Sequence, residues 1–312
     1  MHEQTDTPDL QDPELAELQR SAQAPRLAVL IWFDPSMTWE AAPTGKRGRQ
    51  PSYSDAAIQT CLTMKVLFGM ALRQTTGFVE SLLRLIGLDW AVPDFSTLSR
   101  RQKTLAVNIP YRGSKGPLHL LIDSTGIKVE GEGEWHARKH GGPKRRVWRK
   151  IHLGIDEETL EVRAVEITGS HVGDAPILPD LLSQIPAGEE IGSITADGAY
   201  DTRKCHDAIA DRGAHAVIPP RKNAKPWKTL TAGAIARNEA LRAAKYLGRA
   251  IWRNWSGYHR RSRAETKMHC MKLLGQRLMA RDFDRQVAEV QIRIAVMNGY
   301  TALGIPVTET VG

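Results

Sequence analysis

The sequence has few cysteines and no long apolar run, and both shortages restrict what the protein can be. The three cysteines, Cys61, Cys205 and Cys270, are far apart and odd in number, and no C-x-x-C pair is present. This pattern argues against a disulfide framework or a zinc site and suits a reducing compartment. The longest apolar run, residues 27–33, is too short to span a bilayer. Because no signal-peptide pattern opens the chain either, we expect a cytoplasmic protein without a membrane partner.

Acidic residues are scarce in two stretches of the chain. Residues 138–150 contain seven Lys or Arg and no acid, and residues 221–263 contain twelve Lys or Arg with Glu239 as the single acid. The formal net charge is +8 and the isoelectric point is about 9.5. Clustered positive charge favours a polyanionic partner such as DNA. Solvated faces on a basic protein are the alternative interpretation.

The length of 312 residues is sufficient for two domains. Composition shifts divide the chain into an acidic tail and basic linker, a helical segment, an α/β segment and a short C-terminal tail, with boundaries at 1–52, 53–112, 113–303 and 304–312. We expect the tail to be mobile, because it is polar and acidic and contains several prolines.

Residues 53–112 show three short helical patterns. The first begins near Asp55 and has apolar residues at i+4 steps, the second covers residues 76–86, and the third begins at Ser96. The third would expose Arg100 and Arg101 to solvent. Three helices with a basic last one fit a helix-turn-helix, in which these arginines would face a DNA groove. A helical bundle used for dimerisation or packing fits equally well.

The segment 113–303 predicts an α/β fold with a mixed sheet. Expected strands and helices follow in the order βββαβαβ, at residues 118–123, 147–156, 161–169, 175–184, 192–197, 202–212 and 215–220. Two of these strands end in an aspartate, Asp123 and Asp197. Because ligands collect beyond strand ends in α/β sheets, both acids are expected at one crevice. By contrast, Asp174 and Asp201 fit helix caps.

The segment YHRRSRAETKMHCMKLLG, residues 258–275, surrounds Glu265 with five Lys or Arg. On a helix, Tyr258, Arg261, Glu265 and Lys272 share an arc of about 60° beside an apolar face. Glu265 could form an ordinary i, i+4 ion pair with Arg261, or it could join Asp123 and Asp197 in one site. Three carboxylates repel one another unless a cation lies between them, and Mg²⁺ prefers such oxygen ligands. Two such ions can hold both reacting oxygens of a phosphoryl transfer.

The spacing Tyr258-x2-Arg261-x3-Glu265-x6-Lys272 resembles the Y-R-E-K signature of DDE-type bacterial insertion-sequence transposases. DSTG at 123–126 and ADGAYD at 196–201 are similar to the two aspartate motifs of that family. Over residues 53–303 the chain looks closest to the family named after insertion sequence five. The resemblance implies a ribonuclease H-like catalytic domain over residues 113–303, preceded by a small all-α DNA-binding domain. Asp123, Asp197 and Glu265 would be the catalytic, metal-binding triad for two Mg²⁺ ions, which Mn²⁺ could replace.

The resemblance also implies the partners and the reaction. The protein would bind the inverted-repeat ends of its element and target DNA as a homodimer, associate with the nucleoid, hydrolyse a phosphodiester and join the freed end to target DNA, without a small-molecule substrate. The DNA-contacting residues would be Tyr258, Arg261, Lys272, Lys144, Arg145, Arg146, Arg149, Arg100 and Arg101. Two alternatives remain: a domesticated, non-catalytic DNA-binding protein such as a repressor, and a structure-selective nuclease that cuts without joining.

Overall fold

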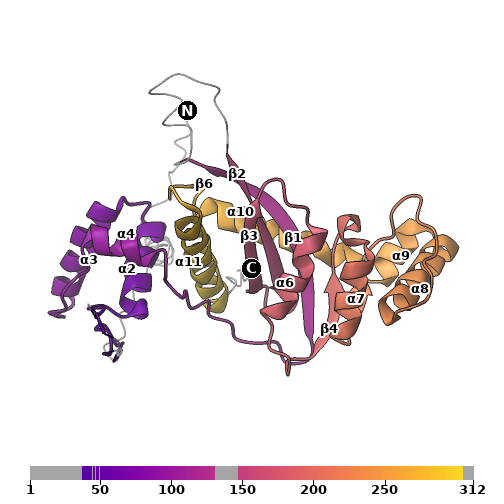
Figure 1. The fold of residues 1–312 in the computed structure, drawn as a ribbon, viewed down its shortest axis with the longest axis horizontal. Coiled ribbons are helices and arrows are strands. Elements are labelled where there is room, and N and C mark those ends of the chain that lie inside the picture. The colour runs from indigo at the N-terminus through magenta and orange to yellow at the C-terminus, as the bar shows by residue number, and fades with distance from the viewer. Residues whose placement is uncertain (1–36, 44, 46, 49, 131–146, 305–312) are drawn as a thin grey trace, which may run out of the picture. The chain divides into compact units, whose positions relative to one another are not determined.

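A six-stranded mixed sheet lies at the centre of the part of the chain that the structure describes (Figure 1). The structure is a computed structural model and describes residues 37–43, 45, 47–48, 50–130 and 147–304. The acidic tail and the basic residues Lys144, Arg145 and Arg146 therefore lie outside the described residues. The described residues from Trp39 onward belong to one compact unit.

The strand order is β3-β2-β1-β4-β5, with β6 beside β1. The strands are β1 (Leu118–Val129), β2 (Trp148–Asp156), β3 (Val162–Gly169), β4 (Ile191–Thr195), β5 (His215–Val217) and β6 (Arg277–Leu278). The first three form an antiparallel meander, whereas β4, β5 and β6 are parallel to their neighbours. The predicted order of elements and the mixed sheet are both confirmed.

Helices cover the two faces of the sheet in separate apolar layers. On one face, Leu120 and Ile122 pack with α6 (Leu178–Ser183) and α7 (Arg203–Asp211). On the other, Leu121 and Ile127 pack with α10 (Ser262–Leu273) and α11 (Phe283–Ala302). Successive side chains of a strand point to opposite faces. Even-numbered residues of β1 therefore face α6 and α7, and odd-numbered residues face α10 and α11.

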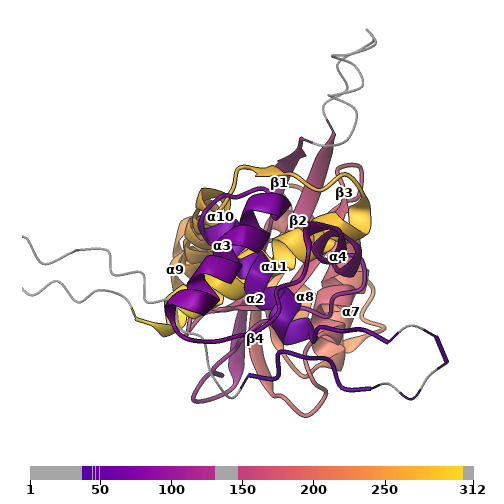
Figure 2. The same ribbon diagram turned by 90° about the vertical axis from the view of Figure 1, so that its left-hand side faces the viewer.

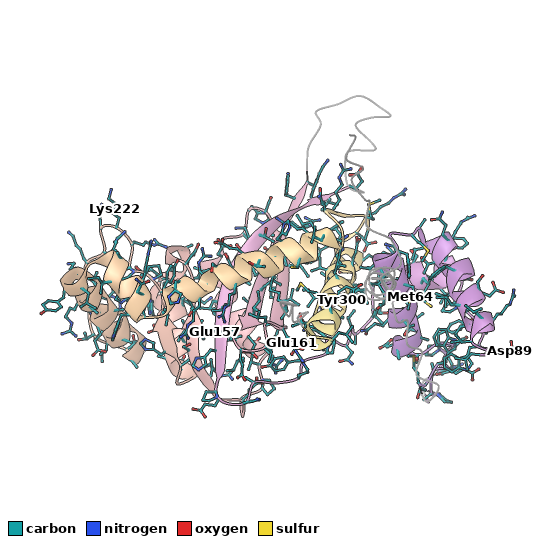
Figure 3. All side chains as sticks on the ribbon, turned by 180° about the vertical axis from the view of Figure 1, so that it is seen from behind. Met64, Asp89, Glu157, Glu161, Lys222 and Tyr300 are labelled. Atoms are coloured by element: carbon teal, nitrogen blue, oxygen red, sulfur yellow. The ribbon has the colours of Figure 1, made fainter. Side chains whose placement is uncertain are left out.

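Two helices occupy the basic stretch between β5 and α10. These are α8 (Ala232–Leu247), which packs against α7, and α9 (Arg249–Trp255). In Figure 1 they lie beyond α7, on the β4 side of the sheet. The preceding loop exposes Lys222, whose side chain points away from the protein in Figure 3.

The N-terminal helices are α2 (Asp55–Leu67), α3 (Leu72–Leu85) and α4 (Phe95–Arg101). The first two meet at 108° across a four-residue connection that contains Gly69, as helix-turn-helix pairs do. The helix predicted at 76–86 starts at Leu72 instead, because Gln74 accepts a hydrogen bond from the backbone N–H of Ala71 and closes the first turn. Helix α2 packs against α11, and Figure 2 shows α2 and α3 in front of it.

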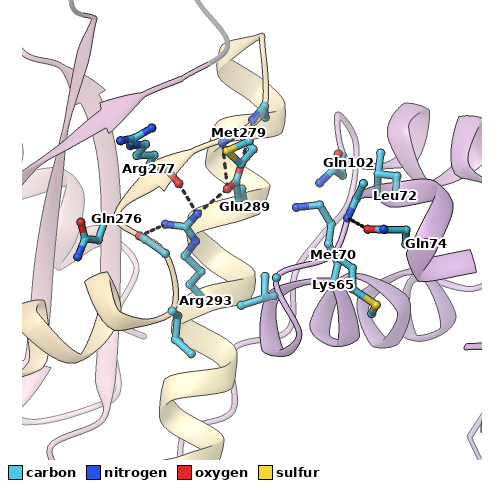
Figure 4. A pocket seen from close by; sticks show the side chains of 16 residues that line it. Lys65, Met70, Leu72, Gln74, Gln102, Gln276, Arg277, Met279, Glu289 and Arg293 are labelled. Atoms are coloured by element: carbon cyan, nitrogen blue, oxygen red, sulfur yellow. Dashed lines mark hydrogen bonds and ion pairs between the residues drawn. The ribbon is translucent and has the colours of Figure 1, made fainter. Parts of the chain in front are cut away.

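A cavity of about 780 Å³ lies between the turn that joins α2 to α3 and the segment from β6 to α11 (Figure 4). Its α11 wall carries a buried ion pair, in which Nη2 of Arg293 lies 2.6 Å from Oε1 of Glu289. Arg293 also donates to the carbonyl oxygens of Gly275 and Arg277. None of the predicted catalytic acids lines this cavity, so it is not the expected crevice.

In the described part of the chain, no single helix is long and apolar enough to cross a membrane. Helices α2 and α3 reach that apolar length only as a pair, across their 108° bend.

Candidate active site

Asp123 lies on β1, and Asp197 lies just beyond the end of the neighbouring strand β4. In the parallel pairing of β1 with β4, Leu121 lies opposite Thr195, and each aspartate follows two residues later. Leu121 faces the α10 layer, so the alternation also directs Asp123 to that layer. The expectation that Asp123 ends its strand is wrong, since β1 continues to Val129. The neighbouring strand β4 stops at Thr195, so among the described strands none pairs with this edge of β1 beside Asp123.

Asp197 is separated from β4 by Ala196 alone and caps the short 3-10 helix Gly198–Tyr200. Its Oδ1 accepts a hydrogen bond from the backbone N–H of Ala199 at 2.8 Å. The side chain is thereby fixed at the strand end, and the residue is half-buried. One carboxylate oxygen is held by the backbone.

Glu265 lies in the first turn of α10, which packs against β1. Arg261, one turn earlier, joins it to the sheet. Its Nη1 is 2.5 Å from Oδ2 of Asp123, and its Nη2 is 2.8 Å from Oε1 of Glu265. The side chains of Asp123 and Arg261 are 14% and 19% exposed, whereas that of Glu265 is 61% exposed. The i, i+4 pair considered from the sequence is therefore present, but Arg261 uses its second nitrogen to reach Asp123.

Burial works against the ionisation of Asp123. Burial raises the pKa of the Asp123 carboxyl above its ordinary value, and the negative charges of Asp197 and Glu265 raise it further. The backbone N–H of Ser124 and the guanidinium of Arg261 oppose this rise. The three predicted acids therefore act on one another electrostatically, and Arg261 is the positive charge placed against two of them.

The donor set suits a hard divalent cation. All three groups are carboxylates, which Mg²⁺ and Mn²⁺ prefer, and a cationic group already bridges two of them. Among the described residues, no group of three His, Cys, Asp or Glu side chains is close enough to hold a metal ion. Metal binding at these acids would therefore require Arg261 to leave the carboxylates it now bridges. The triad stays a prediction.

Tyr258 and Lys272 lie on the same segment as Glu265. Tyr258 begins the 3-10 helix Tyr258–Arg261, and its ring centroid is 6.2 Å from that of the buried Trp252. The guanidinium carbons of Arg253 and Arg261 lie 5.6 and 5.9 Å from the Tyr258 centroid. Lys272 is half-buried in the last turn of α10. Tyr258 thus packs where it can orient Arg261.

A further pair of contacts anchors the start of α10 to the turn between β2 and β3. Nη1 of Arg260 lies 2.7 Å from a carboxylate oxygen of Glu157, and Arg263 donates to the Glu157 carbonyl at 3.2 Å. Figure 3 labels Glu157 in this region. These contacts hold the helix that carries Glu265 against the sheet.

The remaining predicted DNA contacts have different surroundings. Arg100 is exposed at the end of α4. Arg101 is engaged within the protein, because it pairs with Asp55 and donates to the carbonyl of Tyr53 at 2.7 Å. Arg149 donates to Gln286 of α11 at 2.8 Å. These assignments stay predictions, and the contacts favour Arg100 over Arg101 and Arg149 as a residue free to reach DNA.

Sequence reasoning missed the roles of two aspartates. Asp201 is not a helix cap, since Thr202 caps α7. Instead Asp201 is buried, accepts hydrogen bonds from Arg237 at 3.1 and 3.2 Å, and thereby ties α8 to the sheet. Asp174 makes no side-chain capping bond and contacts Ser124 and Lys150. Both contacts involve residues of the motifs already identified from the sequence. Asp201 is the last residue of ADGAYD, and Ser124, the partner of Asp174, belongs to DSTG.

Two models of the transposase DDE domain match this chain. One covers residues 24–132 and the other residues 114–298. The second match alone exceeds half of the 312 residues, so the chain belongs to the family of DDE transposase domains. The mixed sheet with helices on both faces is the ribonuclease H-like fold of that family, and the fold prediction is confirmed.

Family membership makes the protein a transposase in the general sense, an enzyme of the nuclease and transposase type whose partner is DNA. Members of this family typically use a divalent metal. The narrower likeness to the family of insertion sequence five, the Y-R-E-K signature and the domain boundary at 112 stay predictions.

Proposed function

We propose that the protein binds the terminal inverted repeats of its own element and catalyses metal-dependent hydrolysis of a phosphodiester followed by strand transfer. One observation carries this proposal. Asp123 on β1 and Asp197, just beyond the end of β4, each lie two residues past the last paired residues of these parallel strands. Arg261 links Asp123 to Glu265 on α10, the helix that packs against β1.

Asp123, Asp197 and Glu265 would hold two divalent ions, with Mg²⁺ as the physiological metal and Mn²⁺ as a substitute. In such a site, the chemistry supplied is activation of the attacking oxygen and neutralisation of charge on the phosphate. The protein's own part is to bring two carboxylates from neighbouring strand segments and one from α10 to the same place.

Arg261 would change partners when DNA binds. In the free protein it neutralises two carboxylates that would otherwise repel each other. Two oxygens of a DNA phosphate can accept a bidentate pair of hydrogen bonds from the planar guanidinium. Tyr258, packed between Arg253 and Arg261, would keep the released side chain near the cleavage position. Lys272 would add a positive charge further along the same helix.

Positive charge elsewhere would supply affinity for the duplex. Lys144, Arg145 and Arg146 join β1 to β2 in the sequence, and α8 and α9 carry Arg242, Lys245 and Arg249. Phosphate contacts dominate affinity and position the protein, whereas base contacts give specificity. We assign base recognition to the helices of residues 53–112, with Arg100 as the leading contact. A homodimer would bring two element ends together.

The experiment is cleavage of a labelled duplex that carries the element's end, with and without Mg²⁺, followed by capture of the cut end by a target plasmid. Joined product supports the transposase over a nuclease that only cuts. Binding without cleavage, in the presence of either Mg²⁺ or Mn²⁺, would favour the non-catalytic DNA-binding protein.

A further inference from the structure

A polar cluster lies on the face of the sheet opposite to the predicted acids. The hydroxyl of Ser124 donates to Oδ1 of Asp174 at 2.6 Å, and Nζ of Lys150 lies 3.2 Å from the same oxygen. Lys150 also donates to the carbonyl of Val172 at 3.0 Å. Asp174 thus connects β1, β2 and the loop after β3 through one carboxylate.

Ser124 connects this cluster to Asp123. Adjacent residues of a strand point to opposite faces, so the Ser124 side chain faces Asp174 while Asp123 faces α10. The backbone N–H of Ser124 also donates to Oδ1 of Asp123 at 2.8 Å. Fixing the Ser124 hydroxyl therefore restrains the backbone whose N–H holds the Asp123 carboxylate.

This part of β1 needs such a restraint because its second edge is open. Strand β4 pairs with β1 up to Leu121, and β6 begins to pair at Lys128. Among the described strands, residues 122–127 are supported along their length by β2 alone. Backbone groups in an edge position have fewer ladder hydrogen bonds to hold them. A charge-assisted hydrogen bond such as the one from Ser124 to Asp174 compensates for this.

The surroundings of Asp174 show which cation faces it. His152 is fully buried, its Nδ1 lies 3.6 Å from Oδ1 of Asp174 without forming a hydrogen bond, and burial lowers its pKa to about 4. His152 is therefore neutral near pH 7, and Lys150 is the positive partner. Among the residues that the structure describes, none hydrogen-bonds to the buried hydroxyl of Tyr200. Burial together with the charges of Asp174, Asp197 and Asp123 raises its pKa. The two faces of the sheet are thus electrostatically connected at this point.

We propose that Asp174 is a positioning residue, which holds Ser124 from the far face of the sheet and thereby fixes the direction of the Asp123 carboxylate. The inference rests on the proposed function, because it assumes that Asp123 belongs to a metal-dependent site. Neither Asp174 nor Ser124 would touch DNA or metal. Both act through Asp123.

The test uses the full chain, Mn²⁺ alone as the metal probe, and five variants. Ser124→Ala removes the donor, and Ser124→Thr restores a hydroxyl. Asp174→Asn keeps an oxygen that can accept from Ser124 but loses the charge that faces Lys150. The double variant tests whether the two residues act as one unit. Ser193→Ala is the matched control, because it removes a serine hydroxyl bonded at 2.7 Å to His119 on the same pair of strands.

The first readout is Mn²⁺ affinity, measured by electron paramagnetic resonance without DNA. Partners of metal ligands typically change affinity or activity about 10- to 100-fold when removed, and we expect that loss in Ser124→Ala. Ser124→Thr and Ser193→Ala should bind as the wild type does, and the double variant should be close to Ser124→Ala. In cleavage assays kcat should fall while KM for DNA stays constant. The melting temperature of each variant, measured in parallel, distinguishes a specific loss of Mn²⁺ affinity and kcat from a loss of folding.

The outcomes distinguish this inference from the proposed function. A wild type that binds Mn²⁺ and cuts, with Ser124→Ala and Asp174→Asn indistinguishable from Ser193→Ala, would overturn the positioning role alone. A wild type that neither binds Mn²⁺ nor cuts would overturn both. Loss of affinity in Ser124→Ala that Ser124→Thr fails to restore would also count against the hydrogen bond as the cause.

Discussion

Arg261 Nη1 lies 2.5 Å from Oδ2 of Asp123, a contact that joins the start of α10 to the middle of β1 across 138 positions in the sequence. The same guanidinium binds Glu265. This arginine thus neutralises two of the carboxylates, and in the proposed metal site it would compete with the metal for the same oxygens.

We predict that Arg261→Gln binds Mn²⁺ more tightly than the wild type in the absence of DNA, because the competing cation is gone. It should also lose about 1 to 3 kcal/mol of folding free energy near pH 7, as expected when a partly buried charged hydrogen bond is removed. Without the guanidinium the pKa of Asp123 should rise further, so the loss should shrink as the pH falls and the carboxyl becomes protonated.

Calorimetric Mn²⁺ titration and thermal unfolding in EDTA provide the measurements for Arg261→Gln. Arg260→Gln is the matched control, since its side chain pairs with Glu157 outside the triad. Equal Mn²⁺ affinity in both variants would show that Arg261 does not compete with the metal.

Two neighbouring arginines of α4 should behave differently. Arg100→Ala should reduce discrimination between the element's end and random DNA by about 1 to 3 kcal/mol, the usual value of a base contact. Arg101→Ala should instead lower stability by about 1 kcal/mol, because it loses its ion pair with Asp55. Competition binding measures the DNA discrimination of both variants, and thermal unfolding measures their stability. If Arg101→Ala alone lost the preference for the element's end, Arg101 and not Arg100 would be the base contact.

The basic block between β1 and β2 should govern the salt dependence of binding. Replacing Lys144, Arg145 and Arg146 by Ala should reduce the slope of log K against log salt by roughly 0.9 for each DNA phosphate that the variant no longer neutralises. Arg84→Ala is a control, since this exposed arginine pairs with Glu80. The slope is measured by fluorescence anisotropy at several salt concentrations, and an unchanged slope would remove the block from the interface.

Stability should fall as the pH is lowered from about 6.5 to 4. The pKa of His152 is about 4 in the folded protein and 6.5 for an ordinary histidine, so the unfolded state binds the extra proton in this interval. The free energy of unfolding therefore falls by up to about 1.4 kcal/mol for each pH unit across this interval. Denaturant unfolding at pH 7, 6, 5 and 4 measures the slope. His152→Gln should flatten it, and an unaltered slope would assign the acid sensitivity to other groups.

The sequence was sufficient to predict the sheet, whereas the grouping of Asp123, Asp197 and Glu265 in one catalytic site stays a prediction. Apolar runs with period two identified the meander, and parallel strands bring their ends to one edge. Asp123 and Asp197 could therefore be placed together. The continuation of β1 to Val129 was missed because Ser124, Thr125 and Gly126 interrupt its apolar pattern, although pairing with β2 keeps them extended.

Contacts between distant residues were beyond the sequence argument. Asp174 has the local pattern of a helix cap, yet its carboxylate bonds to Ser124, fifty positions away. Arg261 was expected to face DNA. Its contact with Asp123 depends on how α10 packs across β1. Such pairs are set by tertiary packing, which local periodicity does not encode.

Glu265→Gln tests the central claim most directly, because the structure contains the ion pair on which the alternative interpretation depends. If Glu265 were only half of an exposed pair, the change would cost about 0.3 to 0.5 kcal/mol of stability and leave turnover intact. As a ligand in a two-metal site, its loss should remove several kcal/mol of transition-state stabilisation, on the order of a thousandfold in rate. The measurement is Mg²⁺-dependent cleavage of a labelled end duplex beside a gel-shift assay. We predict lost cleavage with retained DNA binding, and cleavage within about tenfold of the wild type, equivalent to about 1.4 kcal/mol, would contradict the account.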